Sequence, residues 1–170
     1  MTPELERGAP PTIRRPTEAD HRAVAAVIDE WFGGRRMADR AARSWFRHVG
    51  STSWLAVDAS DRPLGLLLGY PSQDHPDEAV LHLVAVDPNH RRRGLGRTLV
   101  NAFADDLANL GADQIVALAW PGDPPASAFF VACGFGADAA EGSQNLFGMP
   151  AYPDFEAPGD DRIVFRRSLG

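Results

Sequence analysis

The sequence predicts a mixed α/β (α+β) protein with a central, mostly antiparallel sheet flanked by helices. Three observations support this fold class. Short β-favouring runs follow one another in the first half of the chain, with a hairpin-length turn between them. An apolar run over residues 80–86 then leads through a glycine loop into an amphipathic helix. A second apolar strand and another helix follow, an order that predicts a parallel crossover.

Residues 12–50 predict one short strand and two helices. Thr12 to Arg14 is the strand, and Thr17-Glu18-Ala19-Asp20 resembles a capping box that opens the first helix, which ends at Gly33-Gly34. Its apolar face consists of Val24, Val27, Ile28 and Trp31. The second helix stops at Gly50-Ser51. Helical spacing indicates it at Ala38, Ala41, Ala42, Trp45, Phe46 and Val49.

Strands are predicted next at Ser53 to Val57, Leu64 to Tyr70 and Ala79 to Val86. The helix after the glycine loop ends at Gly111. Its apolar positions are Leu95, Leu99, Phe103, Leu107 and Leu110. Gln114 to Trp120 is nearly all apolar, which is typical of a strand buried on both faces.

The C-terminal part predicts a helix, an irregular segment and a last strand. Asp123 can cap a short helix from Ala126 to Cys133, and Gly134 ends it. Residues 136–160 are rich in glycine, proline and acidic residues, so we expect them to be irregular. Arg162 to Arg167 is the final strand.

Size and composition narrow the possible classes of protein. The 170 residues are interpreted as one domain, with residues 1–11 as a loose tail. The single cysteine suits a reducing cytoplasm, and without a cysteine pair we expect no metal site. A net charge of −6 argues against nucleic-acid binding, and the chain has neither a membrane span nor the apolar core of a signal peptide. All 17 positive charges at neutral pH are carried by arginines and the chain has no lysine, which we attribute to a GC-rich, bacterial genome.

The glycine loop after residue 86 is the strongest functional signal. Gly94-Leu95-Gly96 allows a ligand to approach the backbone closely, and the first N–H groups of the following helix have no intrahelical partner. Arg91, Arg92, Arg93 and Arg97 add four positive charges to a chain that is acidic overall. These features predict an anion site.

Other phosphate-binding loops fit less well. A dinucleotide fingerprint requires a third glycine where Leu99 stands, and a nucleotide P-loop requires a lysine, which this chain lacks. A tight turn with incidental arginines would explain the loop by itself. It would not explain the downstream segment from Asp123 to Phe135.

The two segments together resemble the GCN5-related N-acetyltransferase (GNAT) superfamily. Its acetyl-coenzyme A signature is Gln or Arg, two variable residues, Gly, one variable residue, then Gly or Ala, as in the run from Arg91 to Gly96. Asp123 to Phe135 resembles its later motif, Asn-x-x-Ala-x-x-Phe/Leu-Tyr-x-x-x-Gly-Phe. The motifs stand in the family's order and spacing, and the element order matches from about Thr12 to Arg167.

The resemblance implies a GNAT fold that is splayed between two parallel strands where acetyl-CoA binds. Backbone N–H groups from Arg92 to Arg97 would bind the pyrophosphate, and the loop arginines would also meet the ribose 3′-phosphate. The pantetheine arm would pair with Val84, Ala85 and Val86, and an N–H near Val84 would polarise the thioester carbonyl. By position in the later motif, Asp123 and Phe129 join the cofactor-binding set, although Asp123 also fits a helix cap.

His82 is the predicted general base. It shares one strand face with Val80, Val84 and Val86, and its position resembles that of the strand histidine of arylalkylamine N-acetyltransferases. The glutamate of histone-type relatives would fall at Val80 and is absent. An imidazole can remove a proton from an ammonium group directly or through water. The alternative is a core histidine satisfied by a hydrogen bond.

Phe130 departs from the family pattern. The family's frequent tyrosine at this position donates a proton to the departing thiolate, and a phenyl ring cannot. A thiolate leaves without much help, because thiols have a reference pKa of about 8.5. Ser127, Cys133 and Tyr152 are the candidate donors, although Cys133 also fits a small buried apolar residue.

The amine acceptor is expected to bind between the first two predicted helices and the irregular segment predicted at residues 136–160. Aromatic candidates, each of which also fits an ordinary core role, are Trp31, Phe32, Trp45, Phe46, Phe147, Tyr152 and Phe155. Asp154 or Glu156 could attract a cationic amine, or be solvated surface charges.

The sequence thus predicts an acetyl-CoA-dependent N-acetyltransferase that acts on an amine, a small molecule rather than a protein, by direct attack in a ternary complex. We expect a cytoplasmic monomer or homodimer without metal, nucleic acid or membrane partners. The alternative is a non-catalytic acyl-CoA-binding or sensing domain, because the tyrosine is missing. Acylation of a hydroxyl group or a protein is a third possibility.

Overall fold

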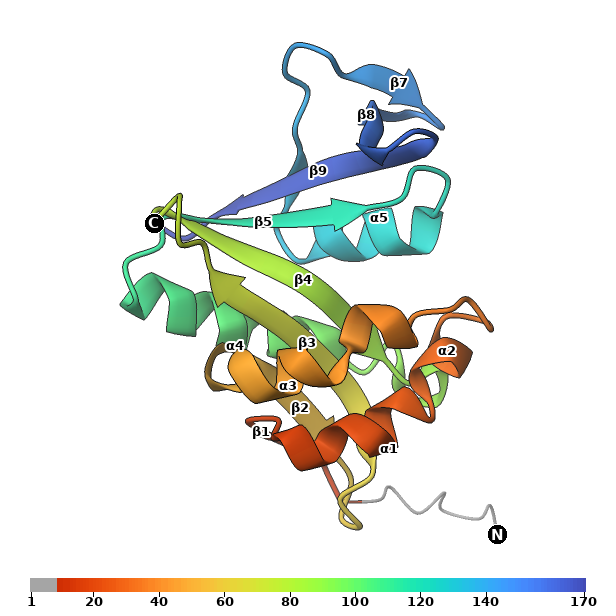
Figure 1. The fold of residues 1–170 in the computed structure, drawn as a ribbon, viewed down its shortest axis with the longest axis vertical. Helices are drawn as coiled ribbons and strands as arrows, with labels where there is room; N and C mark the ends of the chain where they lie inside the picture. Colours follow the sequence, from red (N-terminus) through yellow and green to blue (C-terminus); the bar gives the residue numbers. More distant parts are fainter. Residues whose placement is uncertain (1–8) are drawn as a thin grey trace, which may run out of the picture. The chain divides into compact units, whose positions relative to one another are not determined.

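The strands form a mixed, mostly antiparallel sheet, which confirms the predicted fold class (Figure 1). The computed structural model describes residues 9–170, so most of the predicted tail over residues 1–11 lies outside the described residues. The strand order is β1-β2-β3-β4-β5-β9-β8-β7, and β6 pairs with β9. β4 and β5 run parallel, whereas the pairs β1–β2, β2–β3, β5–β9, β6–β9, β7–β8 and β8–β9 are antiparallel.

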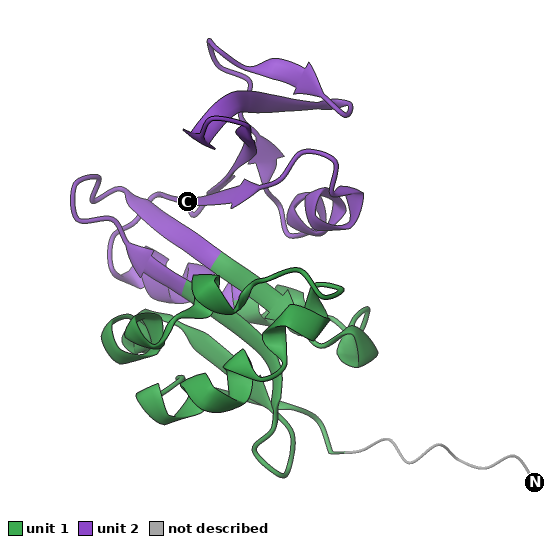
Figure 2. Ribbon diagram, turned by 45° about the vertical axis from the view of Figure 1, so that its right-hand side comes forward, with its two compact units in different colours: residues 1–68, 83–99 green, residues 69–82, 100–170 purple. Residues whose placement is uncertain are grey.

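The described residues form two compact units, residues 9–68 with 83–99 and residues 69–82 with 100–170 (Figure 2). The first unit contains β1 (Thr12–Arg14), β2 (Trp54–Val57), most of β3 (Pro63–Pro71) and the end of β4 (Glu78–Val86). It also contains the short helices α1 (His21–Ala25), α2 (Ile28–Trp31) and α3 (Arg43–His48). Val24, Ile28, Trp31 and Phe46 are buried in it.

The second unit contains the start of β4, most of α4 (Leu95–Asn109), and β5 (Gln114–Ala119) followed by α5 (Pro124–Ala132). Its remaining strands are β6 (Gly136–Ala137), β7 (Gln144–Leu146), β8 (Met149–Ala157) and β9 (Asp160–Ser168). Phe103, Ile115, Phe130, Ile163 and Phe165 are among its core residues.

A glycine on β3 allows α4 to pack closely in this second unit. A methyl group at Gly69 would lie 2.5 Å from two ring carbons of Phe103 and 2.9 Å from the carbonyl oxygen of Val80. Protein interiors do not tolerate such overlaps without a shift of backbone or side chain. The absence of a side chain at this position therefore fixes how the helix lies on the strand.

The two N-terminal helices predicted from periodicity are each broken. The first comprises a 3-10 turn at Glu18–Asp20, α1 and α2, with Val27 outside helical geometry at φ −123° and ψ −19°. The second comprises a 3-10 turn at Ala38–Ala41 and α3, separated by Ala42 in an extended conformation. The predicted faces hold in part, because Val24, Ile28 and Trp31 are buried. Val27 is only half-buried.

Two expectations about the C-terminal half were wrong. Residues 136–160 are not irregular, because β6, β7 and the whole of β8 lie there and β8 forms a hairpin with β9. β5 is not buried on both faces: Ile115, Ala117 and Ala119 are buried, whereas Val116 and Leu118 are half-buried. The predicted strand at Gln114 to Trp120 ends one residue earlier, and the final strand begins at Asp160 rather than Arg162.

The remaining predicted elements are confirmed to within a residue or two, namely β1, β2, β3, β4, α4 and α5. α5 begins at Pro124, two residues before the predicted start, and Gly134 follows it with φ +87°. Among the described residues, no helix is long and apolar enough to cross a bilayer.

Candidate active site

The loop that joins β4 to α4 has the geometry of an anion-binding turn. After Val86, the side chain of Asp87 accepts a hydrogen bond from the Asn89 amide at 2.9 Å and so fixes a short 3-10 turn at Pro88–His90. Arg92 then adopts φ +62° and Gly94 φ +79°, both in the left-handed region. Such a conformation is uncommon for a residue with a side chain, and it clusters at functional sites.

The start of α4 presents unpaired amides. The first backbone hydrogen bond is donated by Thr98 N to Gly94 O at 2.9 Å. The amides of Leu95, Gly96 and Arg97 precede it and have no intrahelical acceptor. A methyl group at Gly94 would have no atom within 4 Å, so the space beside the turn is open. Open space, unpaired amides and a 15-residue helix together suit an anion.

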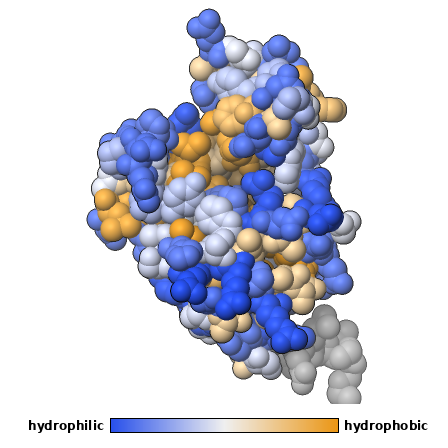
Figure 3. Space-filling model, viewed as in Figure 1, coloured by the Kyte–Doolittle hydropathy of each residue, from blue (hydrophilic) through white to orange (hydrophobic). Residues whose placement is uncertain are grey.

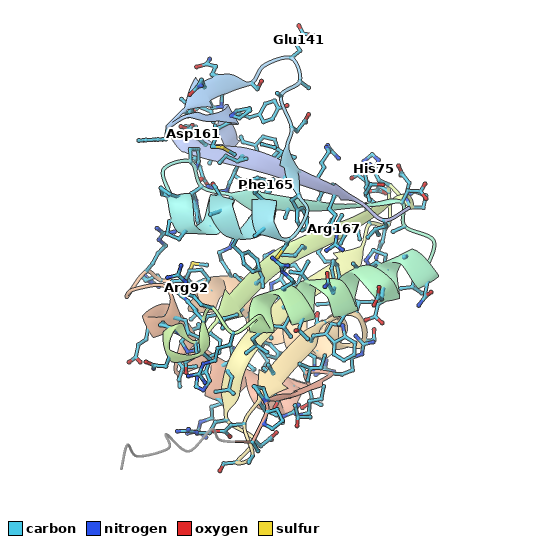
Figure 4. All side chains as sticks on the ribbon, turned by 180° about the vertical axis from the view of Figure 1, so that it is seen from behind. His75, Arg92, Glu141, Asp161, Phe165 and Arg167 are labelled. Atoms are coloured by element: carbon cyan, nitrogen blue, oxygen red, sulfur yellow. The ribbon has the colours of Figure 1, made fainter. Side chains whose placement is uncertain are left out.

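The loop arginines divide into two groups. Arg92, Arg93 and Arg97 are exposed, and none has a side-chain hydrogen bond or ion pair within residues 9–170; Arg92 lies on this loop in Figure 4. Arg91, by contrast, donates from Nε to the Val86 carbonyl oxygen at 3.1 Å and from Nη2 to the Trp31 carbonyl oxygen. Three of the four predicted phosphate ligands are therefore available, and the fourth is engaged with backbone.

β4 presents the predicted base on a partly open face. Val80, His82, Val84 and Val86 are half-buried, whereas the alternate residues Ala79, Leu81, Leu83 and Ala85 are buried. The shared face inferred from strand periodicity is thus confirmed. Ala85, placed in the cofactor set, has its side chain on the buried face, so only its backbone can serve a ligand.

The parallel pairing of β4 with β5 is short. It runs from Glu78 opposite Gln114 to Leu81 opposite Ala117, and this register does not extend to His82. β5 itself continues and stays paired with β9 as far as Ala119 opposite Ile163. Backbone groups of β4 beyond Leu81 are therefore outside that parallel ladder. The predicted splay between the two strands stays a prediction.

α5 is capped as the sequence predicts. Asp123 accepts a hydrogen bond from the Ala126 amide at 3.2 Å, and Pro124 and Pro125 occupy the first turn, where a missing N–H costs nothing. Phe129 is half-buried. Asp123 thus has a structural role in the helix start, and its predicted contact with the cofactor stays a prediction.

Phe130 is a core residue. It is 6% exposed, stacks on Phe165 of β9 at 5.1 Å between ring centroids, and meets the Phe135 ring edge-on at 5.3 Å. Figure 4 shows Phe165 on β9 close to α5. The motif position that carries a tyrosine in the family is here part of an aromatic cluster.

Tyr152 is poorly suited to donate a proton at neutral pH. Its hydroxyl donates to Asp138 Oδ2 at 3.0 Å and accepts from the Ala140 amide at 3.0 Å. Loss of solvent, and then the hydrogen bond to the Asp138 carboxylate, raise the pKa of Tyr152. Cys133 is buried, as the alternative interpretation predicted, which leaves the half-buried Ser127 as the accessible hydroxyl on α5.

The candidate acceptor residues differ widely in exposure. Trp31 and Phe46 are buried, Phe32 and Trp45 are half-buried, and Phe147 and Phe155 are 82% and 47% exposed. Asp154 Oδ1 accepts the Gly159 amide at 2.5 Å, which engages this carboxylate in the β8–β9 hairpin. Glu156 is exposed. On the face drawn in Figure 3, apolar side chains gather in patches between polar ones.

The burial of one charged side chain, that of Arg162, was not predicted from the sequence. Arg162 is 4% exposed, bonded to Asp160, with its guanidinium carbon 4.6 Å from the centroid of a Trp120 ring. Alternating residues in a strand gave no signal that one arginine would be buried. Within residues 9–170, no group of three or more His, Cys, Asp or Glu side chains could hold a metal ion.

The predicted site residues fall in both units. Val84–Val86 and Arg91–Arg97 belong to the first unit, together with Trp31. His82, Asp123, Phe129 and Phe130 belong to the second. Each unit thus contains one of the two sequence motifs, together with the backbone conformation and hydrogen bonds described for that motif.

The profile of the acetyltransferase (GNAT) family matches residues 21–135, which include both motifs. The chain belongs to the GNAT family. Among sequence relatives of this GNAT protein is an L-2,4-diaminobutyric acid acetyltransferase from Nocardia farcinica. The two are 31% identical over 116 residues, which span 68% of this chain and 60% of that relative.

Solved structures share the fold. A GNAT-family protein from Desulfovibrio desulfuricans has a TM-score of 0.75 and 22% identity, covering 95% of this chain and 100% of the other. Diaminobutyrate acetyltransferase from Paenibacillus lautus, solved with L-2,4-diaminobutyric acid and coenzyme A, has a TM-score of 0.72 and 17% identity. That match covers 96% of this chain and 98% of the other. These likenesses show a GNAT fold.

Proposed function

We propose that this GNAT protein transfers an acetyl group from acetyl-CoA to an amine of a small molecule by direct attack in a ternary complex. The observation that carries the proposal is the β4–α4 loop. It combines left-handed backbone at Arg92 and Gly94, unpaired amides at the start of α4, and three exposed arginines that have no side-chain partner in the described part of the chain. An anion site of this kind suits a pyrophosphate and a ribose phosphate.

The cofactor would be held mainly by backbone. Amides of residues 95–97 would donate to the pyrophosphate, while Arg92, Arg93 and Arg97 supply positive charge. The backbone of Val84 to Val86 would pair with the pantetheine arm, and Asp123 and Phe129 would lie nearby, as the family motif implies. Acetyl-CoA supplies the acetyl group as a reactive thioester.

His82 would serve as the general base and Val84 as the oxyanion donor. His82 would take a proton from the substrate ammonium, directly or through a water, so that the nitrogen lone pair can attack. The Val84 amide would donate to the carbonyl oxygen as negative charge develops there. A nitrogen–carbon bond forms, the carbon–sulfur bond breaks, and the nitrogen loses its second proton to solvent. The departing thiolate takes a proton from solvent, directly or relayed through the Ser127 hydroxyl.

The acceptor we propose is a small diamino acid of the 2,4-diaminobutyric acid type. Its support is the name of the Nocardia farcinica relative, whose length this chain matches over 60%. The proposal includes a cytoplasmic, bacterial setting and a single-domain monomer or homodimer without metal, nucleic-acid or membrane partners. The net charge of −6 and the bacterial origin of that relative support this setting.

A non-catalytic acyl-CoA sensor is the second candidate. It is favoured by Phe130, which occupies the position of the family's proton donor and lies in an aromatic cluster. A sensor would bind acetyl-CoA without consuming it.

Release of free thiol from acetyl-CoA separates the two candidates. The purified protein is incubated with acetyl-CoA and a panel of amines. The panel includes 2,4-diaminobutyrate, 1,4-diaminobutane, a monoamine and a peptide with a free N-terminal amine. We expect turnover with the diamino acid above the rate without amine. Binding of acetyl-CoA without turnover on any amine would support the sensor and contradict the enzyme.

A further inference from the structure

Arg91 satisfies two backbone carbonyl groups at the ends of two elements. Val86 is the last residue of β4, and Trp31 is the last residue of α2. The last carbonyls of a helix have no intrahelical donor. The amides of Phe32, Gly33 and Gly34 bond to Asp29 or Glu30 and not to Trp31, so the Arg91 guanidinium supplies the donor that this carbonyl needs.

The charge that phosphates require is available without Arg91. Arg92, Arg93 and Arg97 are exposed and have no protein partner among the described residues. Moving Arg91 to a phosphate would leave the Trp31 and Val86 carbonyls without its N–H groups. Leaving a buried carbonyl group without a donor is costly, so Arg91 is expected to keep its bonds to these two carbonyls while the other three arginines meet the phosphates.

We propose that Arg91 is a positioning residue and not a phosphate ligand. Its hydrogen bonds hold the β4–α4 loop on α2. The inference rests on the proposed function, because it assigns acetyl-CoA to the loop and the amine to the α2 side. α2 ends at the buried Trp31 and is followed by Phe32, which is half-buried and a candidate acceptor residue. Arg91 therefore fixes the position of the residues around Phe32 relative to the β4–α4 loop. Loss of the Arg91 side chain is expected to affect the KM of the amine as well as that of acetyl-CoA.

Two neutral variants test this assignment. Arg91→Gln and Arg91→Met both remove the charge, but only the glutamine keeps an N–H donor for a carbonyl group. Arg93→Gln is the matched control, because it removes one exposed charge from the same loop. For each variant, the affinity for coenzyme A is measured at several salt concentrations, together with kcat and the KM values of both substrates.

Arg91→Met is expected to raise the amine KM about 10-fold or more, and Arg91→Gln to stay within about 3-fold of wild type. Neither should change how coenzyme A affinity falls with salt. Arg93→Gln should weaken coenzyme A binding and flatten its salt dependence, because the charge that it removes contacts the phosphates, whereas the Arg91 guanidinium is bonded to backbone carbonyls. It should leave the amine KM unchanged.

The proposal is overturned if both Arg91 variants are equally impaired and both flatten the salt dependence as Arg93→Gln does. Failure of wild-type protein to bind coenzyme A would instead contradict the proposed function. In that case the thermal unfolding midpoint still decides the inference. It should fall for Arg91→Met and be retained by Arg91→Gln, whereas equal midpoints would refute the link between loop and α2.

Discussion

His82 is the residue whose role depends most on its surroundings. Its half-buried place on β4, between Val80 and Val84, leaves the imidazole accessible on a face of aliphatic neighbours. Strand periodicity was enough to predict this face, because side chains alternate strictly along a strand. The step from that position to a role as base depends on the family resemblance.

We predict that His82→Gln lowers kcat/KM for the amine roughly 100-fold or more, the usual contribution of a general base. The rise of rate with pH should also be lost, since no imidazole remains to take the proton. His75→Gln is the control, because His75 is exposed in the β3–β4 connection. An unchanged pH–rate profile in His82→Gln would assign the base elsewhere.

Phe130, Tyr152 and Arg91 show where reasoning about single residues stops. The sequence identifies Phe130 as a departure from the motif, but not that its ring stacks on Phe165, which is distant in the chain. It names Tyr152 as a proton donor, but not the Asp138 carboxylate that accepts a hydrogen bond from its hydroxyl. It groups Arg91 with its neighbours, whereas the partners of Arg91 are backbone carbonyls. Each missed feature includes a contact between residues distant in the chain, which for Arg91 is the bond to the Trp31 carbonyl oxygen.

At the scale of elements, local pattern predicted most strands and both motif-bearing helices. It failed where a hydrogen bond to a side chain fixes a turn, or where a strand forms only because it pairs with other strands. Asp29 Oδ1 accepts the amides of Met37 and Ala38 at 2.7 and 2.8 Å, which fixes a turn between the broken helices. β8 contains Pro150 and Pro153, yet forms a strand because β9 and β7 pair with it and a register shift absorbs its irregularity.

An ion cluster holds β1 against its neighbours. Arg14 bonds Asp20 at 2.8 Å and Asp61 at 2.9 Å, and the Asp20 side chain is 13% exposed. The hydrogen bond from Arg14 is the main cause that lowers the pKa of Asp20 in the fold. A lowered folded-state pKa contributes stability above the unfolded-state value, which is about 3.9, and this stability is lost as pH falls below it.

We therefore predict that Asp20→Asn lowers the free energy of unfolding by about 1 kcal/mol at neutral pH. The difference from wild type should shrink as the pH falls below about 4. Denaturant unfolding at several pH values measures it. Asp39→Asn is the control, since its ion pair with Arg36 is solvent-exposed and should contribute little. A difference that stays constant down to low pH would contradict the role of the Asp20 charge.

At the scale of the whole molecule, the proposed function depends on one assignment, that the β4–α4 loop binds the phosphates of coenzyme A. Family membership and fold are consistent with it, and the loop supplies the amides, open space and charge. The identity of the amine is not encoded in any comparable local pattern. It depends on how side chains from several elements meet around the substrate, which composition and periodicity do not specify.

The most direct test is the affinity for acetyl-CoA of Gly94→Glu beside Gly111→Glu, measured by calorimetric titration. Both glycines have positive φ, +79° and +95°, and open space around them, so the two variants carry similar backbone strain and the same added charge. We predict that wild type and Gly111→Glu bind alike, and that Gly94→Glu binds at least about tenfold more weakly, because a carboxylate faces the pyrophosphate. Equal affinities of all three proteins would contradict the assignment of this loop.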